Sequence, residues 1–209
     1  MSFEEGLKAY KSGDVRQAIQ LWQQAAENGD RLAQFNIAVM LENGEHLSAN
    51  PWEARIWYQK SADQGYAPAQ FNLAMMFYYG QGGAVDKSQA AYWYASAGNQ
   101  GMADAQFNLA QMYAEGDGVT RNFEIAVQWY RVAVEHLHMQ AANNLGIRYA
   151  MGEGVPRDDM EAYKWFNIAA ELGDVQAVRH RERVGKELSA EQMVEAGRLA
   201  MSWLAERCR

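Results

Sequence analysis

Four closely similar segments recur along the chain at one fixed spacing. The motif AQFN begins at Ala33, Ala69 and Ala105, and the related AANN begins at Ala141, so successive copies are 36 residues apart. Self-similarity at a period of a few tens of residues is typical of solenoids, in which each unit buries its apolar face against the next one. The constant register predicts four equal repeats with no insertion between them.

Each repeat contains the pattern of two helices joined by a glycine-bearing loop. In the first helix, apolar and small residues recur four positions apart, as at Ala69, Leu73 and Phe77, which places them on one stripe. A glycine, free to take positive φ, follows that helix in every repeat. These glycines are Gly44, Gly80, Gly116 and Gly152, and the loop then holds Gly82, Gly118 and Gly154, with His46 at that place in the first repeat.

The second helix of each repeat begins at a side chain that can accept hydrogen bonds from free backbone N–H groups. These predicted N-caps are Asn50, Asp86, Asn122 and Asp158. Three residues later, Glu53, Gln89 and Glu161 predict the return partner of a capping box, whereas Ile125 breaks the pattern. Recurring Ala, Trp and Tyr or Phe then predict close helix packing, and we interpret the tryptophans as core residues. The tryptophans are Trp57, Trp93, Trp129 and Trp165, followed by Tyr58, Tyr94, Tyr130 and Phe166.

These columns resemble the Sel1-like repeat, a relative of the tetratricopeptide repeat, most clearly over residues 69–101 and 105–135. The resemblance implies an all-α, right-handed α-solenoid of helix-turn-helix repeats, with residues 1–209 forming a single repeat domain. We expect repeats at 33–68, 69–104, 105–140 and 141–176. Residues 1–32, with a shorter turn, resemble a tetratricopeptide hairpin. Residues 177–209 should form capping helices. The last of them, beginning at a capping box of Ser189 and Gln192, should cover the fourth repeat, including Trp165 and Phe166.

One repeat boundary departs from the others. Glycine stands at Gly29, Gly65, Gly101 and Gly173, but Leu137 stands between the third and fourth repeats. Two interpretations are open: the leucine is simply tolerated in the turn, with or without an altered backbone, or it changes the local superhelical pitch and makes a binding feature there.

Composition and charge indicate which classes of partner and which cellular location to expect. A net charge of −7, without any run of basic residues, disfavours nucleic acid and anionic membranes. No stretch approaches the roughly 20 apolar residues of a membrane span, and the acidic first residues do not resemble a secretory leader, so we expect a cytoplasmic location. The one cysteine, Cys208, excludes internal disulfides and is interpreted as incidental.

The sequence contains no recognisable catalytic or metal-binding constellation. His136 and His138 are two residues apart and should point in different directions, which does not make a metal site. Ser61, Ser88 and Ser96 lack a nucleophile elbow or a triad pattern, and Gly80–Gly83 is better explained as a turn than as a phosphate loop. We therefore expect a noncatalytic protein without a cofactor or metal ion.

The face of the first helices opposite the buried stripe is the candidate partner surface. In related repeats this face lines a concave groove, so the resemblance implies that a protein partner binds there. The predicted partner-binding residues are Phe35, Val39, Glu42, Phe71, Met75, Tyr78, Tyr79, Phe107, Gln111, Glu115, Ile147 and Met151. Two interpretations are open for the Phe column and for Asn36, Asn72, Asn108 and Asn144: they pack adjacent helices, or their side chains contact a bound peptide.

The function most consistent with these features is protein–protein interaction, with the chain acting as an adaptor or assembly scaffold that binds a protein segment in its groove. A second hypothesis comes from the family, in which some bacterial members are immunity proteins that neutralise a toxin. A third is β-lactam binding or hydrolysis, to which cysteine-rich relatives have been linked. Those relatives carry paired cysteines in every repeat, whereas this chain has only Cys208.

Overall fold

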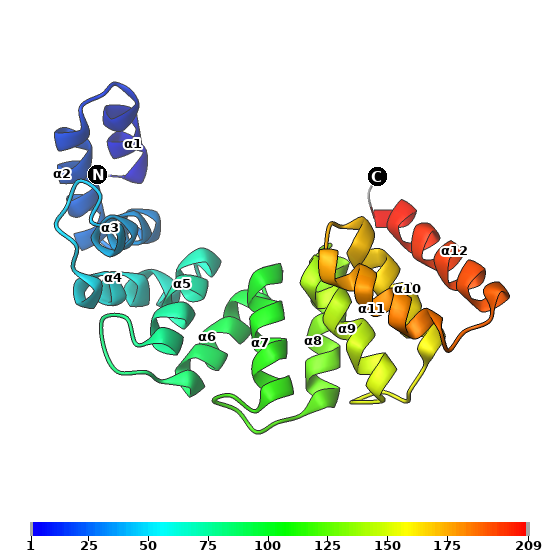
Figure 1. The fold of residues 1–209 in the computed structure, drawn as a ribbon. Helices are drawn as coiled ribbons and strands as arrows, with labels where there is room; N and C mark the ends of the chain where they lie inside the picture. Colours follow the sequence, from blue (N-terminus) through cyan, green and yellow to red (C-terminus); the bar gives the residue numbers. More distant parts are fainter. Residues whose placement is uncertain (1, 208–209) are drawn as a thin grey trace. The chain divides into compact units, whose positions relative to one another are not determined.

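The computed structural model describes residues 2–207, which form twelve α-helices and no β-strand (Figure 1). The all-α class predicted from the repeat pattern is therefore confirmed. Cys208, interpreted above as incidental, lies outside the described residues. The chain divides into two compact units, Met1–Gln100 and Gly101–Arg209.

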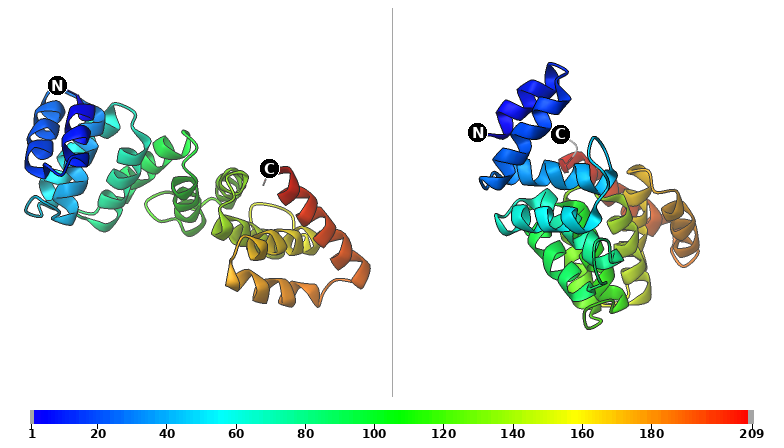
Figure 2. Two further views of the ribbon diagram at one scale, coloured as in Figure 1. Left: turned by 90° about the horizontal axis from the view of Figure 1, so that it is seen from above. Right: turned by 90° about the vertical axis from the view of Figure 1, so that its left-hand side faces the viewer.

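The first unit consists of three helical hairpins. Its helices are α1 (Phe3–Lys11), α2 (Val15–Glu27), α3 (Arg31–Asn43), α4 (Pro51–Asp63), α5 (Ala67–Tyr79) and α6 (Lys87–Gly98). Each helix packs against the next one along the chain, as Figure 2 shows for the antiparallel pair α1 and α2. Trp22, Tyr58, Leu73 and Met76 are buried in this unit, and fully buried alanines such as Ala54 let the helices approach closely.

The second unit contains two hairpins and two further helices. Its helices are α7 (Ala103–Glu115), α8 (Phe123–Glu135), α9 (Met139–Met151), α10 (Asp159–Glu171), α11 (Val175–Gly185) and α12 (Ala190–Arg207). α10 lies against α9, α11 and α12. The core includes Val134, Leu145 and Ile168, and α12, red in Figures 1 and 2, covers one side of it with Ala200 and Leu204.

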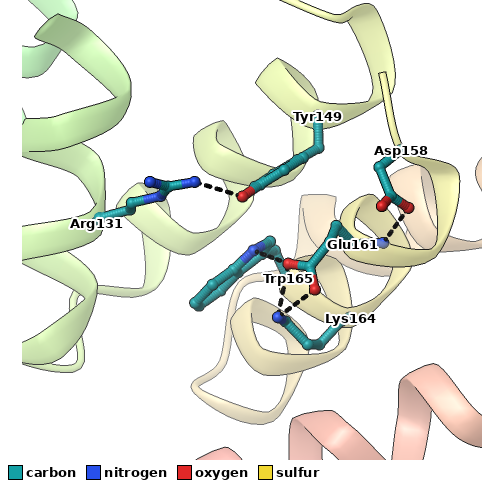
Figure 3. A network of polar contacts seen from close by, with 6 residues as sticks. All are labelled: Arg131, Tyr149, Asp158, Glu161, Lys164 and Trp165. Atoms are coloured by element: carbon teal, nitrogen blue, oxygen red, sulfur yellow. Dashed lines mark hydrogen bonds and ion pairs between the residues drawn. The ribbon is translucent and has the colours of Figure 1, made fainter. Parts of the chain in front are cut away.

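The predicted N-caps are confirmed, but the acids that follow them make different contacts. Asp158 accepts a hydrogen bond of 3.0 Å from the backbone N–H of Glu161, as the sequence predicts. The Glu161 carboxylate does not close a capping box; it accepts 3.0 Å from the Trp165 indole and pairs with Lys164 (Figure 3). Glu53 is likewise 3.4 Å from the Trp57 indole. The acid thus supplies the acceptor that a partly buried tryptophan N–H requires.

The glutamine of AQFN explains why that motif recurs. The Gln34 amide donates 3.1 Å to the carbonyl of Ala26 in the last turn of α2, and Gln70 donates 3.1 Å to Ala62 in α4. Each glutamine oxygen then accepts 2.7 Å from a second glutamine, Gln64 or Gln100. Because these amides are buried, the hydrogen bonds satisfy groups that would otherwise be costly. The apolar periodicity of the sequence does not predict these glutamine hydrogen bonds, because they join polar side chains of different helices.

The second loop glycine is required where consecutive repeats meet. Gly154 has φ +73°, and a Cβ there would overlap the backbone carbonyl of Phe123 at the start of α8. A Cβ at Gly82 would overlap the Pro51 carbonyl at the start of α4 in the same way. His46, with φ 64°, stands at this place in the first repeat and packs beside Tyr10, with ring centroids 6.4 Å apart. The tip of each of these two loops therefore contacts the start of the second helix of the preceding repeat.

Leu137 keeps the positive φ of the glycines that stand at the equivalent repeat boundaries. Its φ is 61°, in the left-handed region, whereas Gly173 and Gly29 have φ of 105° and 91° at the equivalent boundaries. The first interpretation is supported, because the turn is retained and the leucine carries the strain of a positive φ.

The C-terminal helices α11 and α12 cover different side chains of the fourth repeat. α12 contacts Trp165 through Trp203, with ring centroids 5.6 Å apart, and the predicted capping box of Ser189 and Gln192 is confirmed by bonds of 2.8 and 3.2 Å. Phe166 instead packs with Val184 and His180 of α11. The expectation that the last helix covers both aromatic residues is therefore wrong for Phe166.

Candidate functional site

The phenylalanines of the predicted partner face pack within their own repeats. Phe35 lies 5.7 Å from Tyr58 and 5.1 Å from Tyr66 between ring centroids, and Phe71 lies 5.7 Å from Tyr94. Each phenylalanine remains half-buried. The ring contacts support the packing interpretation of this column in the first unit.

Two further residues of that face hold the Tyr58 hydroxyl. Tyr58 donates a 2.6 Å hydrogen bond to the Glu42 carboxylate and accepts 2.9 Å from the Asn72 amide. Burial, and then the neighbouring Glu42 carboxylate, raise the pKa of Tyr58 well above its usual value. In the second unit, Asn144 donates 3.2 Å to Tyr130 in the same manner. Asn72 therefore ties α5 to α4, and Asn144 ties α9 to α8, and Glu42 belongs to the first of these internal networks.

The end of α5 carries the most accessible aromatic group of the predicted face. Tyr79 is 63% exposed, and its ring meets the partly buried Tyr78 edge-on, with centroids 5.0 Å apart. Val39 and Met75, on α3 and α5, are half-buried. An exposed tyrosine fixed against a second ring is a suitable anchor for a partner side chain.

In the second unit, Phe107 and Gln111 line a pocket of about 350 Å³ between α7, α9 and the start of α11. Its other lining residues are Met139, Gln140, Asn143, Asn144, Gly173, Asp174, Val175 and Gln176. Five side-chain amides thus surround an apolar lining from Phe107, Met139 and Val175. Amides offer both donors and acceptors, which matches the alternating groups of a peptide backbone.

The remaining predicted residues of this unit lie away from the pocket. Glu115 is exposed and Met151 is 57% exposed near the ends of α7 and α9. Ile147 packs against the cluster of Phe166 and Val184. The structure therefore gathers Phe107 and Gln111 with Asn144 of the predicted asparagine column, and also with Gln140 and Gln176, which the repeat register did not associate with them.

His138 fixes one side of this region. Its Nδ1 accepts a 3.2 Å hydrogen bond from the backbone N–H of Ala141 and caps α9, while its ring stacks on Phe107 at 4.5 Å between centroids. Nε2 lies 3.3 Å from Asp104 of α7. Burial lowers the pKa of His138, against the opposing attraction of Asp104. Burial prevails because the His138 side chain is 10% exposed, whereas that of Asp104 is 68% exposed and screened by water.

We expect mild acid to weaken the second unit through His138. A lowered folded-state pKa means that the neutral ring stabilises the fold above the unfolded value of about 6.5, and that this contribution is lost as pH falls through the folded-state pKa. Urea unfolding at a series of pH values from about 7.5 to 5.5 measures the loss. His138→Asn keeps a capping acceptor and should flatten the response. The control is the exposed His136→Asn; an equal flattening there would contradict the assignment.

No group of three His, Cys, Asp or Glu side chains that could hold a metal ion occurs in the described part of the chain. Within residues 2–207, none of the helices combines the length and apolar character needed to cross a membrane. His136 and His138 occupy different environments, one exposed at the end of α8 and the other capping α9.

The repeats of this chain match a known protein family. The Sel1 repeat model matches residues 1–30, 31–66, 67–102, 103–136 and 140–174. The chain belongs to the Sel1 repeat family. Each matched Sel1 repeat begins within two residues of the start of the first helix of its hairpin, and the matches include the N-terminal hairpin with the short turn. No curated protein matches the chain.

Two solved structures share the fold of these Sel1 repeats. A protective antigen of uropathogenic Escherichia coli is 30% identical with a TM-score of 0.80, over 99% of this chain and 49% of that one. A Sel1 repeat protein from Oxalobacter formigenes is 29% identical, also with a TM-score of 0.80, over 95% of this chain and 84% of that one. The α-solenoid class is thereby confirmed, and the chain spans about half the length of the Escherichia coli protein.

Proposed function

We propose that the chain is a noncatalytic protein-interaction module that binds an extended protein segment on the first-helix face of its repeats. The observation that carries this proposal is the amide-lined pocket around Phe107 and Gln111. An extended segment could place one apolar side chain against Phe107 and Met139 while its backbone bonds to Gln111, Gln140 and Gln176. The Sel1 scaffold supports the same general role, because stacked repeats present extended surfaces.

In the first unit, we propose that Tyr79 contacts the partner. It is the exposed aromatic group of the predicted face, with Tyr78 and Met75 on the same helix. Truncation of an aromatic anchor at an interface costs about 2 kcal/mol or more in binding. Phe35, Phe71, Glu42 and Asn72 are left out of the contact surface proposed for this unit, because their side chains bond or pack internally.

The proposal is tested by affinity capture from the native cell, followed by mass spectrometry of the proteins retained. We expect a partner held by the parent chain to be lost at least tenfold from a Gln111→Ala/Gln140→Ala variant, and from Tyr79→Ala, with melting temperatures unchanged. Gln128→Ala, an exposed amide on α8 outside the pocket, is the matched control and should retain the partner. A partner held equally by all these variants would overturn the proposed face.

The same capture separates the finer versions of the function. An adaptor retains components of a cellular assembly, whereas an immunity protein retains a toxin encoded next to it. The noncatalytic assignment is checked by a β-lactam hydrolysis assay of the purified chain, in which sustained turnover would contradict it.

A further inference from the structure

A second surface, on the second-helix side of the first unit, carries features that the repeat architecture does not demand. A pocket of about 330 Å³ lies on α4 and is lined by Trp52, Arg55, Ile56, Gln59, Lys60 and Gly82. We call it the α4 pocket. Trp52 is 65% exposed and Ile56, one turn later on the same helix, is 37% exposed. Two large apolar side chains on one accessible face are a typical interface feature.

Two side chains that line the α4 pocket, Trp52 and Lys60, are specific to this repeat. At successive 36-residue intervals from Trp52 stand Ser88, Glu124 and Met160, and from Lys60 stand Ser96, Val132 and Ile168. Columns that pack the solenoid keep their residue type, as the Ala, Trp and Tyr columns do. The side chains of the α4 pocket therefore serve a local purpose rather than the stacking of repeats.

Arg55 is held in place by its surroundings. Its guanidinium lies 3.8 Å from the centre of the Phe77 ring, and it donates a 3.5 Å hydrogen bond to the Ala84 carbonyl. Gly83 makes room for it, because a Cβ at that position would overlap the guanidinium. The equivalent loop residues of the other repeats are Leu47, Val119 and Val155, so this pairing of an arginine with a loop glycine occurs only where α4, of the repeat 33–68, meets the loop of the next repeat. A positioned cation loses little entropy when it binds an anion.

The α4 pocket is lined by positive charge, whereas the whole chain carries a net negative charge. Both charged residues that line it, Arg55 and Lys60, are cations, although the net charge of the chain is −7. Lys60 is fixed 3.8 Å from the Trp57 ring. The acids of α4 are already engaged: Glu53 contacts Asn50 and Trp57, and Asp63 accepts 2.8 Å from Gln59. The pocket thus offers an apolar lining beside two cations.

We propose that the α4 pocket binds an acidic protein segment bearing a large apolar or aromatic side chain. That side chain would pack between Trp52 and Ile56, and the flanking carboxylates would pair with Arg55 and Lys60. This surface is distinct from the first-helix face of the proposed function. The chain could therefore join two partners, since the two surfaces are formed by different helices.

The test uses isotope-labelled protein titrated with a short synthetic peptide in which one Phe is flanked on both sides by Glu. We expect the indole N–H signal of Trp52 to shift on binding, and the dissociation constant to rise at least tenfold in Trp52→Ala and in Lys60→Glu. Both side chains lie at the surface of α4, so the melting temperature should be kept. The same peptide with Lys in place of Glu, or Ser in place of Phe, should bind at least tenfold more weakly.

Two variants serve as matched controls. Tyr92→Ala removes an exposed aromatic residue at the position equivalent to Ile56, and Lys11→Glu makes the same change of net charge at a distant exposed site. Both should bind the peptide as the parent does. Equal weakening in the controls, or equal binding of all three peptides, would show nonspecific attraction and overturn the proposal. A Trp52-dependent dimer in sedimentation would also overturn it, because the pocket would then bind a second copy.

Discussion

Replacing Gly154 with alanine should be among the most damaging single changes in the second unit. The left-handed φ of +73° alone costs an alanine about 1–2 kcal/mol. The new Cβ would also overlap the carbonyl of Phe123, so either the loop or the start of α8 must move. We expect the free energy of unfolding, measured by urea titration, to fall by roughly 3 kcal/mol or more.

Gly65→Ala separates the two causes. Gly65 has φ +78°, close to that of Gly154, but a Cβ there meets no atom within 4 Å. Only the backbone strain of about 1–2 kcal/mol should appear in this control. If both variants lose the same stability, the close approach of the loop to α8 does not matter and the explanation of the second loop glycine fails.

Deleting the chain from Ser189 onward should have an effect of similar size. The deletion removes α12, whose Ala196, Ala200 and Leu204 are buried and whose Trp203 covers Trp165. The pair of Arg207 and Glu135, 2.7 Å apart, is also lost. Burial of this apolar surface accounts for roughly 3–5 kcal/mol, so we expect the melting temperature to fall by about 10 °C and the chain to associate.

Point variants show whether the effect comes from the buried side of α12. Leu204→Ala should cost about 2–3 kcal/mol, whereas Met201→Ala, at a position 55% exposed, should cost little. A truncated chain that stays monomeric with the parent melting temperature would refute the capping role. Phe166 should remain protected in the truncated protein, because α11 covers it.

The fold could be predicted closely from the sequence because each position of the repeat occurs four times, so the residue type that the position requires can be compared among four copies. Columns such as Leu73 and Ala54 showed which stripes are buried, and N-caps such as Asp158 showed where the second helices begin. Long-range polar pairing was not accessible in this way. The bond between Gln34 and Gln64, and the shift of Glu161 from a capping box to Trp165, depend on how neighbouring helices are placed.

The candidate site was predictable only in part. The register placed Phe107 and Gln111 on one side of α7, but it carried no information that α11, outside the repeats, brings Gln176 to the same pocket. Phe35 and Glu42 occupy the predicted face, yet their contacts with Tyr58 are internal. Periodicity identifies a helix face, whereas the use of each side chain depends on its neighbours.

The glutamine bond at the repeat junctions bears on how such a chain can change length over evolution. Each junction in the first unit needs only a carbonyl in the last turn of one helix, at Ala26 or Ala62, and a glutamine near the start of the next. A copied block of 36 residues carries both halves of this bond, so duplication in register leaves no buried amide unsatisfied. The junction before the fourth repeat lacks the glutamine, because Ala142 stands in that column. Gene duplication or engineered insertion should therefore be tolerated better in the first unit than at that junction.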